Sequence, residues 1–129
     1  GQFLIEIDPE LDMAHQNLGI AYFLSGRVDD AERALVRAAE INPRLKETWS
    51  ILGDLYLAGH EIDKARQAYE KSLAIDPHQG KVHNNLAVVY YYKKEYKEAS
   101  RHIEEAGRLG FKVSGGFKKE LEKHLRNRD

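Results

Sequence analysis

The sequence predicts an all-α fold in which pairs of helices repeat along the chain. Small and apolar residues recur in columns spaced by 34 residues. A fixed period of this length is typical of repeat architectures, in which each unit buries its apolar face against its neighbours. Within each unit the apolar residues fall at i, i+3, i+4 and i+7, the spacing of one helix face. We therefore expect a solenoid of helical hairpins with three full repeats.

The columns that define the period hold one kind of residue each. They are Leu18, Leu52 and Leu86; Tyr22, Tyr56 and Tyr90; Ala31, Ala65 and Ala99; and Pro9, Pro43 and Pro77. The leucine, tyrosine and alanine columns are predicted to lie in the core. A further column, Gly19, Gly53 and Ala87, is small, which indicates that two helices approach closely there.

Helix limits follow from the places where each apolar stripe starts and stops. We expect helices at residues 10–24, 28–41, 45–58, 62–75, 79–92 and 96–109. Ser25-Gly26, Gly59-His60 and Lys93-Lys94 are predicted to form the turns inside the hairpins, where glycine adopts unusual backbone angles at little cost. Pro43 and Pro77 end the second helix of a pair, because proline cannot continue a helix.

The two ends of the chain differ from the repeats. Residues 2–9 repeat the pattern of the end of a second helix, so we expect a leading repeat that was cut from a longer array. After Ser114-Gly115-Gly116, which is predicted to break the chain, an apolar stripe over 117–125 predicts a capping helix. The single domain is divided into a truncated leading repeat (1–11), repeats 1 to 3 (12–45, 46–79 and 80–113) and the cap (114–129).

The second repeat carries a resemblance to a known family. Its pattern is Trp49-x-x-Leu52-Gly53-x-x-Tyr56, followed by Ala65-x-x-x-Tyr69 and then Pro77. This pattern resembles the tetratricopeptide repeat, a helix–turn–helix of 34 residues. The departures are His15 and His83 in the tryptophan column, Ala87 in the glycine column, and Phe111 in place of proline. The resemblance implies a right-handed superhelix whose first helices line a concave groove.

A groove of this kind implies a non-catalytic scaffold or adaptor that binds a protein or peptide. The candidate groove residues vary between repeats, whereas the packing columns do not. They are Met13, Gln16, Asn17, Ile20 and Phe23; Glu47, Ser50, Asp54 and Leu57; and Lys81, Asn84, Asn85, Val88, Tyr91 and Tyr92. Aromatic rings supply contact area and amides can pair with a peptide backbone. The alternative is that Phe23, Tyr91 and Tyr92 simply pack between helices.

Some members of the family clamp a C-terminal carboxylate with Lys, Asn and Arg at set places. Here those places hold Gln16, Ile20 and Ile51 in the first two repeats. In the third repeat, Lys81 matches but its companion is Asn85 rather than Arg. The sequence therefore disfavours binding of a chaperone tail.

Self-association is the alternative function. Phe3, Leu4 and Ile7 belong to the incomplete leading repeat and would expose apolar surface, which favours weak homo-oligomers. Residues 1–43 carry three Lys/Arg against eight Asp/Glu, and 78–129 carry twelve against seven. An acidic leading end and a basic trailing end favour head-to-tail contact, which salt would weaken.

Composition argues against several other functions. The net charge of −1 gives no bias toward nucleic acid, and no apolar run approaches the ~20 residues of a membrane span. No phosphate-binding loop, catalytic pair or metal-ligand set is apparent, so we expect no enzyme activity and no cofactor. His15 and His83 fall in a packing column, and His102 and His124 are expected to be exposed. Lack of cysteine leaves the periplasm open, although the cytosol is favoured.

Overall fold

The computed structural model describes residues 9–127, which form seven α-helices and no strand. The helices are α1 (Pro9–Leu24), α2 (Val28–Ile41), α3 (Lys46–Ala58), α4 (Ile62–Ile75), α5 (Gly80–Tyr92), α6 (Tyr96–Arg108) and α7 (Gly115–Arg126). Helices α1 to α6 each begin and end within one residue of the limits predicted from the apolar stripes. Phe3, Leu4 and Ile7 lie outside the described residues.

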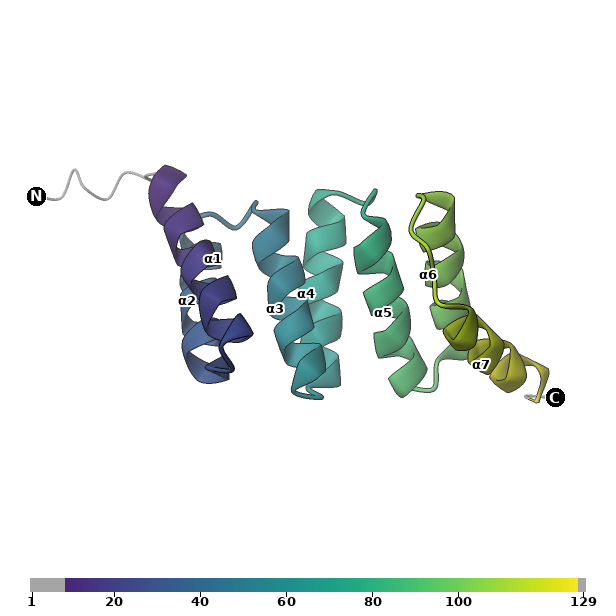
Figure 1. Cartoon of the computed structure of the whole chain (residues 1–129). Helices are drawn as coiled ribbons and strands as arrows, with labels where there is room; N and C mark the ends of the chain where they lie inside the picture. Colours follow the sequence, from purple (N-terminus) through teal and green to yellow (C-terminus); the bar gives the residue numbers. More distant parts are fainter. Residues whose placement is uncertain (1–8, 128–129) are drawn as a thin grey trace, which may run out of the picture.

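The helices stand side by side in two layers along the molecule (Figure 1). Helices α1, α3 and α5 form a front layer, and α2, α4 and α6 form a back layer. Each front helix packs most extensively on the back helix of its own hairpin, and neighbouring hairpins then pack through α2 with α3 and α4 with α5. Helix α7 follows α6 at the C-terminal end, as a cap requires. The predicted all-α solenoid of helical hairpins is thus confirmed.

The column of small residues marks the closest approach of the two layers. A Cβ added at Gly53 would lie 2.5 Å from Cε1 of Tyr69, and one added at Gly19 would lie 2.6 Å from Cγ of Leu35. The third repeat has Ala87 in this column and, one period after Tyr69, the smaller Ile103. The bulkiest facing side chain, Tyr69, therefore meets a glycine, and the third repeat combines alanine with an aliphatic residue.

Burial of the leucine and tyrosine columns is uneven. Leu52 and Leu86 are 2% and 1% exposed, because each packs on the hairpin before it. Leu18 is 45% exposed, since no helix precedes α1 in the part of the chain that the structure describes. The prediction of a core position is therefore wrong for Leu18, and Tyr22 and Tyr56 are only half-buried.

The turns inside the hairpins share one residue with left-handed backbone. It is Gly26 in the first turn, His60 in the second and Lys94 in the third, with φ between 60° and 83°. Glycine was expected to serve this purpose at position 59, but Gly59 has φ of −85° and the strain falls on His60. The next backbone N–H in each turn donates to a tyrosine carbonyl at 2.8–2.9 Å: Arg27 to Tyr22, Glu61 to Tyr56, and Glu95 to Tyr90.

Helix α7 begins earlier than the sequence suggested. Ser114 is its N-cap, and the Ser114 hydroxyl accepts a hydrogen bond from the Phe117 backbone N–H at 3.3 Å. Gly115 and Gly116 therefore form the first turn of α7 rather than a break before it. The capping hydrogen bond of Ser114 outweighs the low helix propensity of the two glycines, because it satisfies a backbone N–H that would otherwise lack a partner.

Candidate functional site

All the predicted groove residues lie on the front helices α1, α3 and α5. Five are exposed: Met13, Asn17, Glu47, Lys81 and Tyr92. Nine are half-buried: Ile20, Phe23, Ser50, Asp54, Leu57, Asn84, Asn85, Val88 and Tyr91. Gln16 is buried. The set thus combines accessible side chains with others that hold the repeats together.

Four of these residues have structural contacts that account for their burial. The Gln16 side chain is 5% exposed, and its amide oxygen accepts a hydrogen bond from the Thr48 hydroxyl of α3. Phe23, Leu57 and Tyr91 occupy one column and pack against the two clusters of core residues. These side chains join successive front helices.

Tyr91 also connects α5 to the cap. Its ring centroid lies 5.7 Å from that of Phe117 and 5.5 Å from that of His124, both on α7. His124 in turn stacks on Tyr96 at 4.3 Å with an interplanar angle of 9°. His124 was expected to be exposed, but this stacking leaves it half-buried. Aromatic contacts therefore seat α7 on the third repeat.

A polar cluster lies at the centre of the front layer. The Asp54 carboxylate of α3 accepts hydrogen bonds from the Tyr69 hydroxyl of α4 and from the Asn85 amide of α5, the latter at 3.1 Å. Burial raises the pKa of Asp54, while Tyr69, Lys81 and Asn85 oppose that rise. Burial and the Asp54 charge raise the pKa of Tyr69. This cluster fixes the orientation of Asn85 between the second and third repeats.

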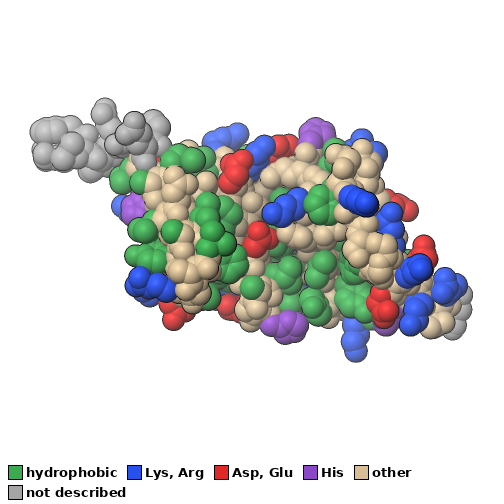
Figure 2. Space-filling model, in the orientation of Figure 1, with side chains coloured by type: hydrophobic (Ala, Val, Ile, Leu, Met, Phe, Trp, Pro, Cys, Tyr) green, Lys and Arg blue, Asp and Glu red, His purple; other side chains and the backbone are tan. Residues whose placement is uncertain are grey.

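The front face is apolar at one end and basic at the other. In Figure 2, hydrophobic side chains gather over α1 and α3, and basic side chains become frequent toward α7. The exposed apolar residues on α1 include Leu11, Met13, Leu18 and Leu24. A ligand lying along the front face would therefore meet two different chemical environments.

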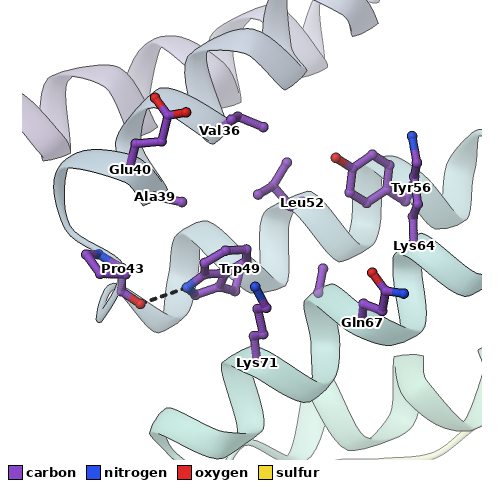
Figure 3. Close-up of a pocket in the computed structure, with 11 residues that line it drawn as sticks. Val36, Ala39, Glu40, Pro43, Trp49, Leu52, Tyr56, Lys64, Gln67 and Lys71 are labelled. Atoms are coloured by element: carbon purple, nitrogen blue, oxygen red, sulfur yellow. Dashed lines mark hydrogen bonds between the residues drawn. The ribbon is translucent and has the colours of Figure 1, made fainter.

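A hollow lies between α2 and α4, over α3, and we call it the back groove (Figure 3). Its volume is about 550 Å³, within the range of roughly 300–1,000 Å³ typical of ligand sites. Its apolar lining consists of Val36, Ala39, Pro43, Trp49, Leu52, Tyr56 and Ala68. The sequence interpretation missed this site, because it treated Trp49, Leu52 and Tyr56 only as packing residues. The available signal was the small side chain at position 68, whose counterpart one period later is His102.

Within the third hairpin, a histidine of α5 contacts a histidine of α6. The Nδ1 atoms of His83 and His102 are 3.0 Å apart, and Nε2 of His83 lies 2.8 Å from the Pro77 carbonyl oxygen. The carbonyl can only accept, so neutral His83 donates from Nε2 and accepts at Nδ1 from His102. The prediction that His102 is exposed is wrong, because this bond and the stacking of His102 on Tyr90 draw it inward.

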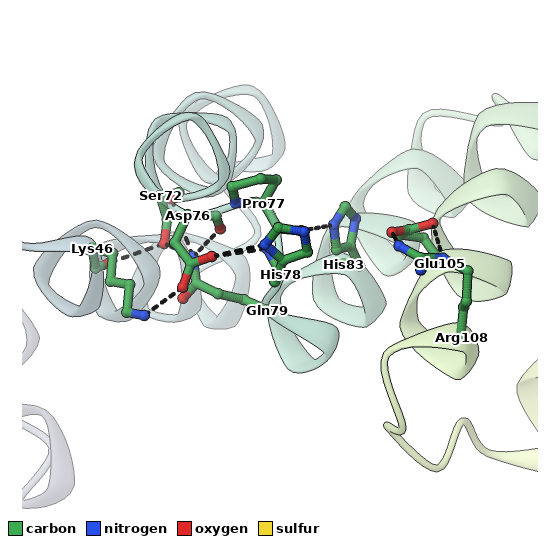
Figure 4. Close-up of polar contacts among 9 residues, drawn as sticks. All are labelled: Lys46, Ser72, Asp76, Pro77, His78, Gln79, His83, Glu105 and Arg108. Atoms are coloured by element: carbon green, nitrogen blue, oxygen red, sulfur yellow. Dashed lines mark hydrogen bonds and ion pairs between the residues drawn. The ribbon is translucent and has the colours of Figure 1, made fainter.

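The loop from α4 to α5, which carries Pro77, is held by polar contacts on both sides (Figure 4). The Asp76 carboxylate binds the Lys46 ammonium and accepts from the His78 backbone N–H at 2.9 Å. These hydrogen bonds lower the pKa of Asp76. The Gln79 amide donates to the Ser72 and Asp76 carbonyl oxygens at 3.1 and 2.8 Å. The loop therefore presents the Pro77 carbonyl to His83 in a fixed position.

Replacing His102 with Gln should reduce the loss of stability in acid. Burial, and then the charge of His83, lower the pKa of His102 below its usual value of 6.5, so the unfolded chain binds this proton more readily. The stability due to neutral His102 is therefore complete above pH 6.5 and is lost as the pH falls through that value toward the lowered pKa. Urea unfolding on either side of pH 6.5 measures the difference.

The matched control for this experiment is His78→Gln, because the His78 side chain is 72% exposed. It should keep the pH dependence of the parent protein. An equal change in both variants would show that the buried histidine pair has no special part in acid sensitivity.

Residues 9–127 contain neither a cluster of metal ligands nor a helix that could span a membrane. No three His, Asp or Glu side chains among them lie together as metal ligands would. Within the same residues, no helix combines the length and the apolar character needed to cross a bilayer.

Comparison with known protein families gives three matches, and all of them are to tetratricopeptide-repeat models. A family model described as TPR repeat matches residues 53–94, and two described as Tetratricopeptide repeat match 13–45 and 84–106. No curated protein sequence matches the chain.

Solved structures with this arrangement of helices are numerous. The Arabidopsis OM64 TPR domain superimposes with a TM-score of 0.84 at 20% identity, over 89% of this chain and 97% of that one. The first TPR of Spaghetti (RPAP3), bound to HSP90 peptide SRMEEVD, gives 0.83 at 16% identity, over 93% and 94%. A crystal structure of MamA gives 0.75 at 27% identity, and the match covers 89% of this chain but 63% of MamA.

Proposed function

Because this chain belongs to the tetratricopeptide-repeat family of protein-interaction modules, we propose that its front layer binds a peptide or partner helix along α1, α3 and α5. The observation that carries the proposal is a contrast between columns within the chain. The alanine column that begins at Ala31 is the same in all three repeats and fully buried. The front column that begins at Met13 continues as Glu47 and Lys81, and all three of these side chains are exposed. Front residues are thus free to serve a ligand.

The chemistry of the front face suits a peptide. Met13 and Tyr92 are exposed apolar groups at opposite ends of the face, and the Asp54–Asn85 pair offers oriented polar atoms between them. The Spaghetti domain, which has the same fold, holds a peptide in its structure, and this supports peptide binding in general. The Asn85 departure from the carboxylate clamp still disfavours a C-terminal tail as the ligand. Proteins of this fold typically act as scaffolds without catalysis.

Replacing Asn84 and Tyr92 together with Ala should weaken peptide binding by about tenfold or more, since residues that anchor an interface each contribute about 1–2 kcal/mol. Tyr92 is a better test residue than Tyr91, because Tyr91 packs against α7. Peptides first selected from an arrayed library would be titrated into both proteins by calorimetry. The melting temperature should change little, because Tyr92 is 51% exposed and Asn84 is half-buried.

A matched double variant, Lys119→Ala with Glu122→Ala, changes two exposed side chains on α7 and should bind as the parent does. If the front-layer variant also keeps full affinity, the ligand docks on another surface and the proposal fails.

Self-association is a second candidate function, favoured by the stripe on α1. Leu11 and Leu18 are exposed, and their counterparts one period later, Leu45 and Leu52, are half-buried and buried. We expect Leu18→Glu to remove any concentration-dependent increase in sedimentation coefficient. High salt should weaken association between the acidic and basic ends but spare apolar pairing of two α1 stripes. A parent protein that is monomeric at every concentration would eliminate this candidate.

A further inference from the structure

Among the described residues, the apolar lining of the back groove is confined to the first two hairpins. One period later, the position of Ala68 holds His102, whose ring stacks on Tyr90 at 5.5 Å with an interplanar angle of 7°. The same ring forms the hydrogen bond to His83. The position of Ala39 likewise becomes Leu73, which packs on the core. Larger side chains therefore cover the apolar floor of the second interval, which we call the filled interval, and the hollow of about 440 Å³ beside it is lined by polar residues that include His83, His102 and Glu105. Alanines leave the apolar floor of the first interval open.

The charge on the rim changes together with the size of the hollow. Lys64 and Lys71 line the α4 side of the back groove, and one period later these positions hold Glu98 and Glu105. Seven residues separate the two lysines, which places them about 10.5 Å apart along the helix. The open interval therefore has a basic rim, whereas in the filled interval Glu98 and Glu105 are paired with Arg101 and Arg108.

Both lysines lean over the aromatic floor of the back groove. The Lys71 ammonium lies 4.5 Å from the centroid of the Trp49 ring, and the Lys64 ammonium lies 5.5 Å from that of Tyr56. Lys64 also pairs with Glu61 at 3.3 Å, whereas Lys71 forms no ion pair with any described residue. A carboxylate that arrives from outside can thus meet Lys71 without displacing another acid.

The opposite side of the back groove carries the other charge. Glu40 of α2 lines it and is paired with Arg37 at 3.4 Å. The groove is therefore asymmetric, with an apolar floor, a basic side on α4 and an acidic side on α2. An occupant with carboxylates along one edge would fit it in one orientation only.

We propose that the back groove binds an amphipathic segment of a protein partner that has an acidic edge. A leucine or phenylalanine of this segment enters beside Trp49 and Leu52, and its carboxylates contact Lys64 and Lys71. Burial of the apolar side chain supplies most of the affinity, and the lysines determine the orientation. This site is distinct from the front face, because the lysines and Ala68 lie on the back layer. The protein would then join two partners, one on each layer.

The test uses Trp49, because it is the single tryptophan of the chain and lies in the site itself. The probe is a synthetic amphipathic peptide made of Leu and Glu with one Phe and no Trp. The same peptide with Lys at every Glu position is its counterpart. We expect saturable change of Trp49 fluorescence with the acidic peptide and little with the basic one.

Three variants assign the binding to the groove. Ala68→His copies the filled interval and should abolish the fluorescence change. Lys64→Gln with Lys71→Gln should weaken binding roughly twofold to thirtyfold, the range expected for two exposed ion pairs. Val36→Glu copies Glu70 of the filled interval at a position that is 37% exposed, so it provides a second obstruction if Ala68→His does not fold. Tyr92→Ala, on the front layer, should leave binding unchanged.

Several outcomes would overturn the proposal. They are the absence of a response to the acidic peptide, an equal response to both peptides, and undiminished binding by folded Ala68→His and Val36→Glu. A fluorescence change that follows protein concentration alone would assign the groove to a second copy of the chain instead. None of these results depends on whether the front layer binds a peptide, so the two proposals can fail separately.

Discussion

Replacing Tyr69 with Ala should lower the free energy of unfolding by about 3–5 kcal/mol, the usual cost of truncating a large buried aromatic residue. Tyr69 is fully buried and belongs to the larger of the two core clusters. The change would also remove the hydroxyl that donates to Asp54, leaving that carboxylate with the Asn85 amide as its hydrogen-bond donor. Losing a donor to a partly buried carboxylate adds to the cost of the cavity. Urea unfolding followed by circular dichroism measures the difference.

Tyr92→Ala provides the comparison, because it removes the same side chain from an exposed position on the next hairpin. We expect a change of less than about 1 kcal/mol there, as is usual at surface sites. Similar losses for the two variants would mean that Tyr69 is not the central packing residue.

Gly53→Ala should destabilise the protein by about 1–3 kcal/mol, although alanine is the better helix former by about 1 kcal/mol. The added methyl would meet the Tyr69 ring at 2.5–2.8 Å, and this ring has no room to move. In the third repeat, the positions of Gly53 and Tyr69 are occupied by Ala87 and Ile103, so a methyl group there faces an aliphatic side chain instead of a ring. The double variant Gly53→Ala with Tyr69→Ile should therefore cost less than the sum of its two single changes.

A coupling energy of about 0.5–3 kcal/mol in this cycle would confirm that the two columns are fitted to each other. Gly107→Ala is the matched control, since a Cβ at Gly107 meets nothing within 4 Å. That change should be neutral or stabilising by up to about 1 kcal/mol. Strict additivity of the Gly53 and Tyr69 changes would contradict the packing argument.

Much of the fold was predictable because local and repeated signals agree. Apolar stripes placed α1 to α6, and the small column correctly indicated close approach at Gly19 and Gly53. The turn residue was harder to predict, since the repeat fixes the backbone at position 60 even though the neighbouring Gly59 would accept it at lower cost. Position in the repeat outweighed the preference of the individual residue.

The candidate sites were less predictable, because exposure depends on neighbours in other repeats. Periodicity puts Leu18 and Leu52 in one column, yet their burial differs because only Leu52 has a described hairpin before it. The back groove depends on the small size of Ala68 compared with His102, its counterpart one period later. Aligning the repeats shows this difference, but a search for core positions does not reveal that it opens a groove. The role of Tyr91 depended on where α7 packs, which the amphipathic stripe of that helix does not specify.

The core is divided into two clusters of unequal size, so we expect local unfolding to start at one end of the molecule. The larger cluster joins α4, α5, α6 and α7 and includes Tyr69 and Leu121, whereas the smaller one joins α2, α3 and part of α4. Because helices contact only near neighbours along the row, opening at one end need not disturb the other. Amide hydrogens of α1 and α2 should therefore exchange with solvent fastest, and protection should increase toward α5 and α6. A partner that spans the row would slow exchange most in α1, because the hairpin of α1 and α2 has a described neighbouring hairpin on one side only.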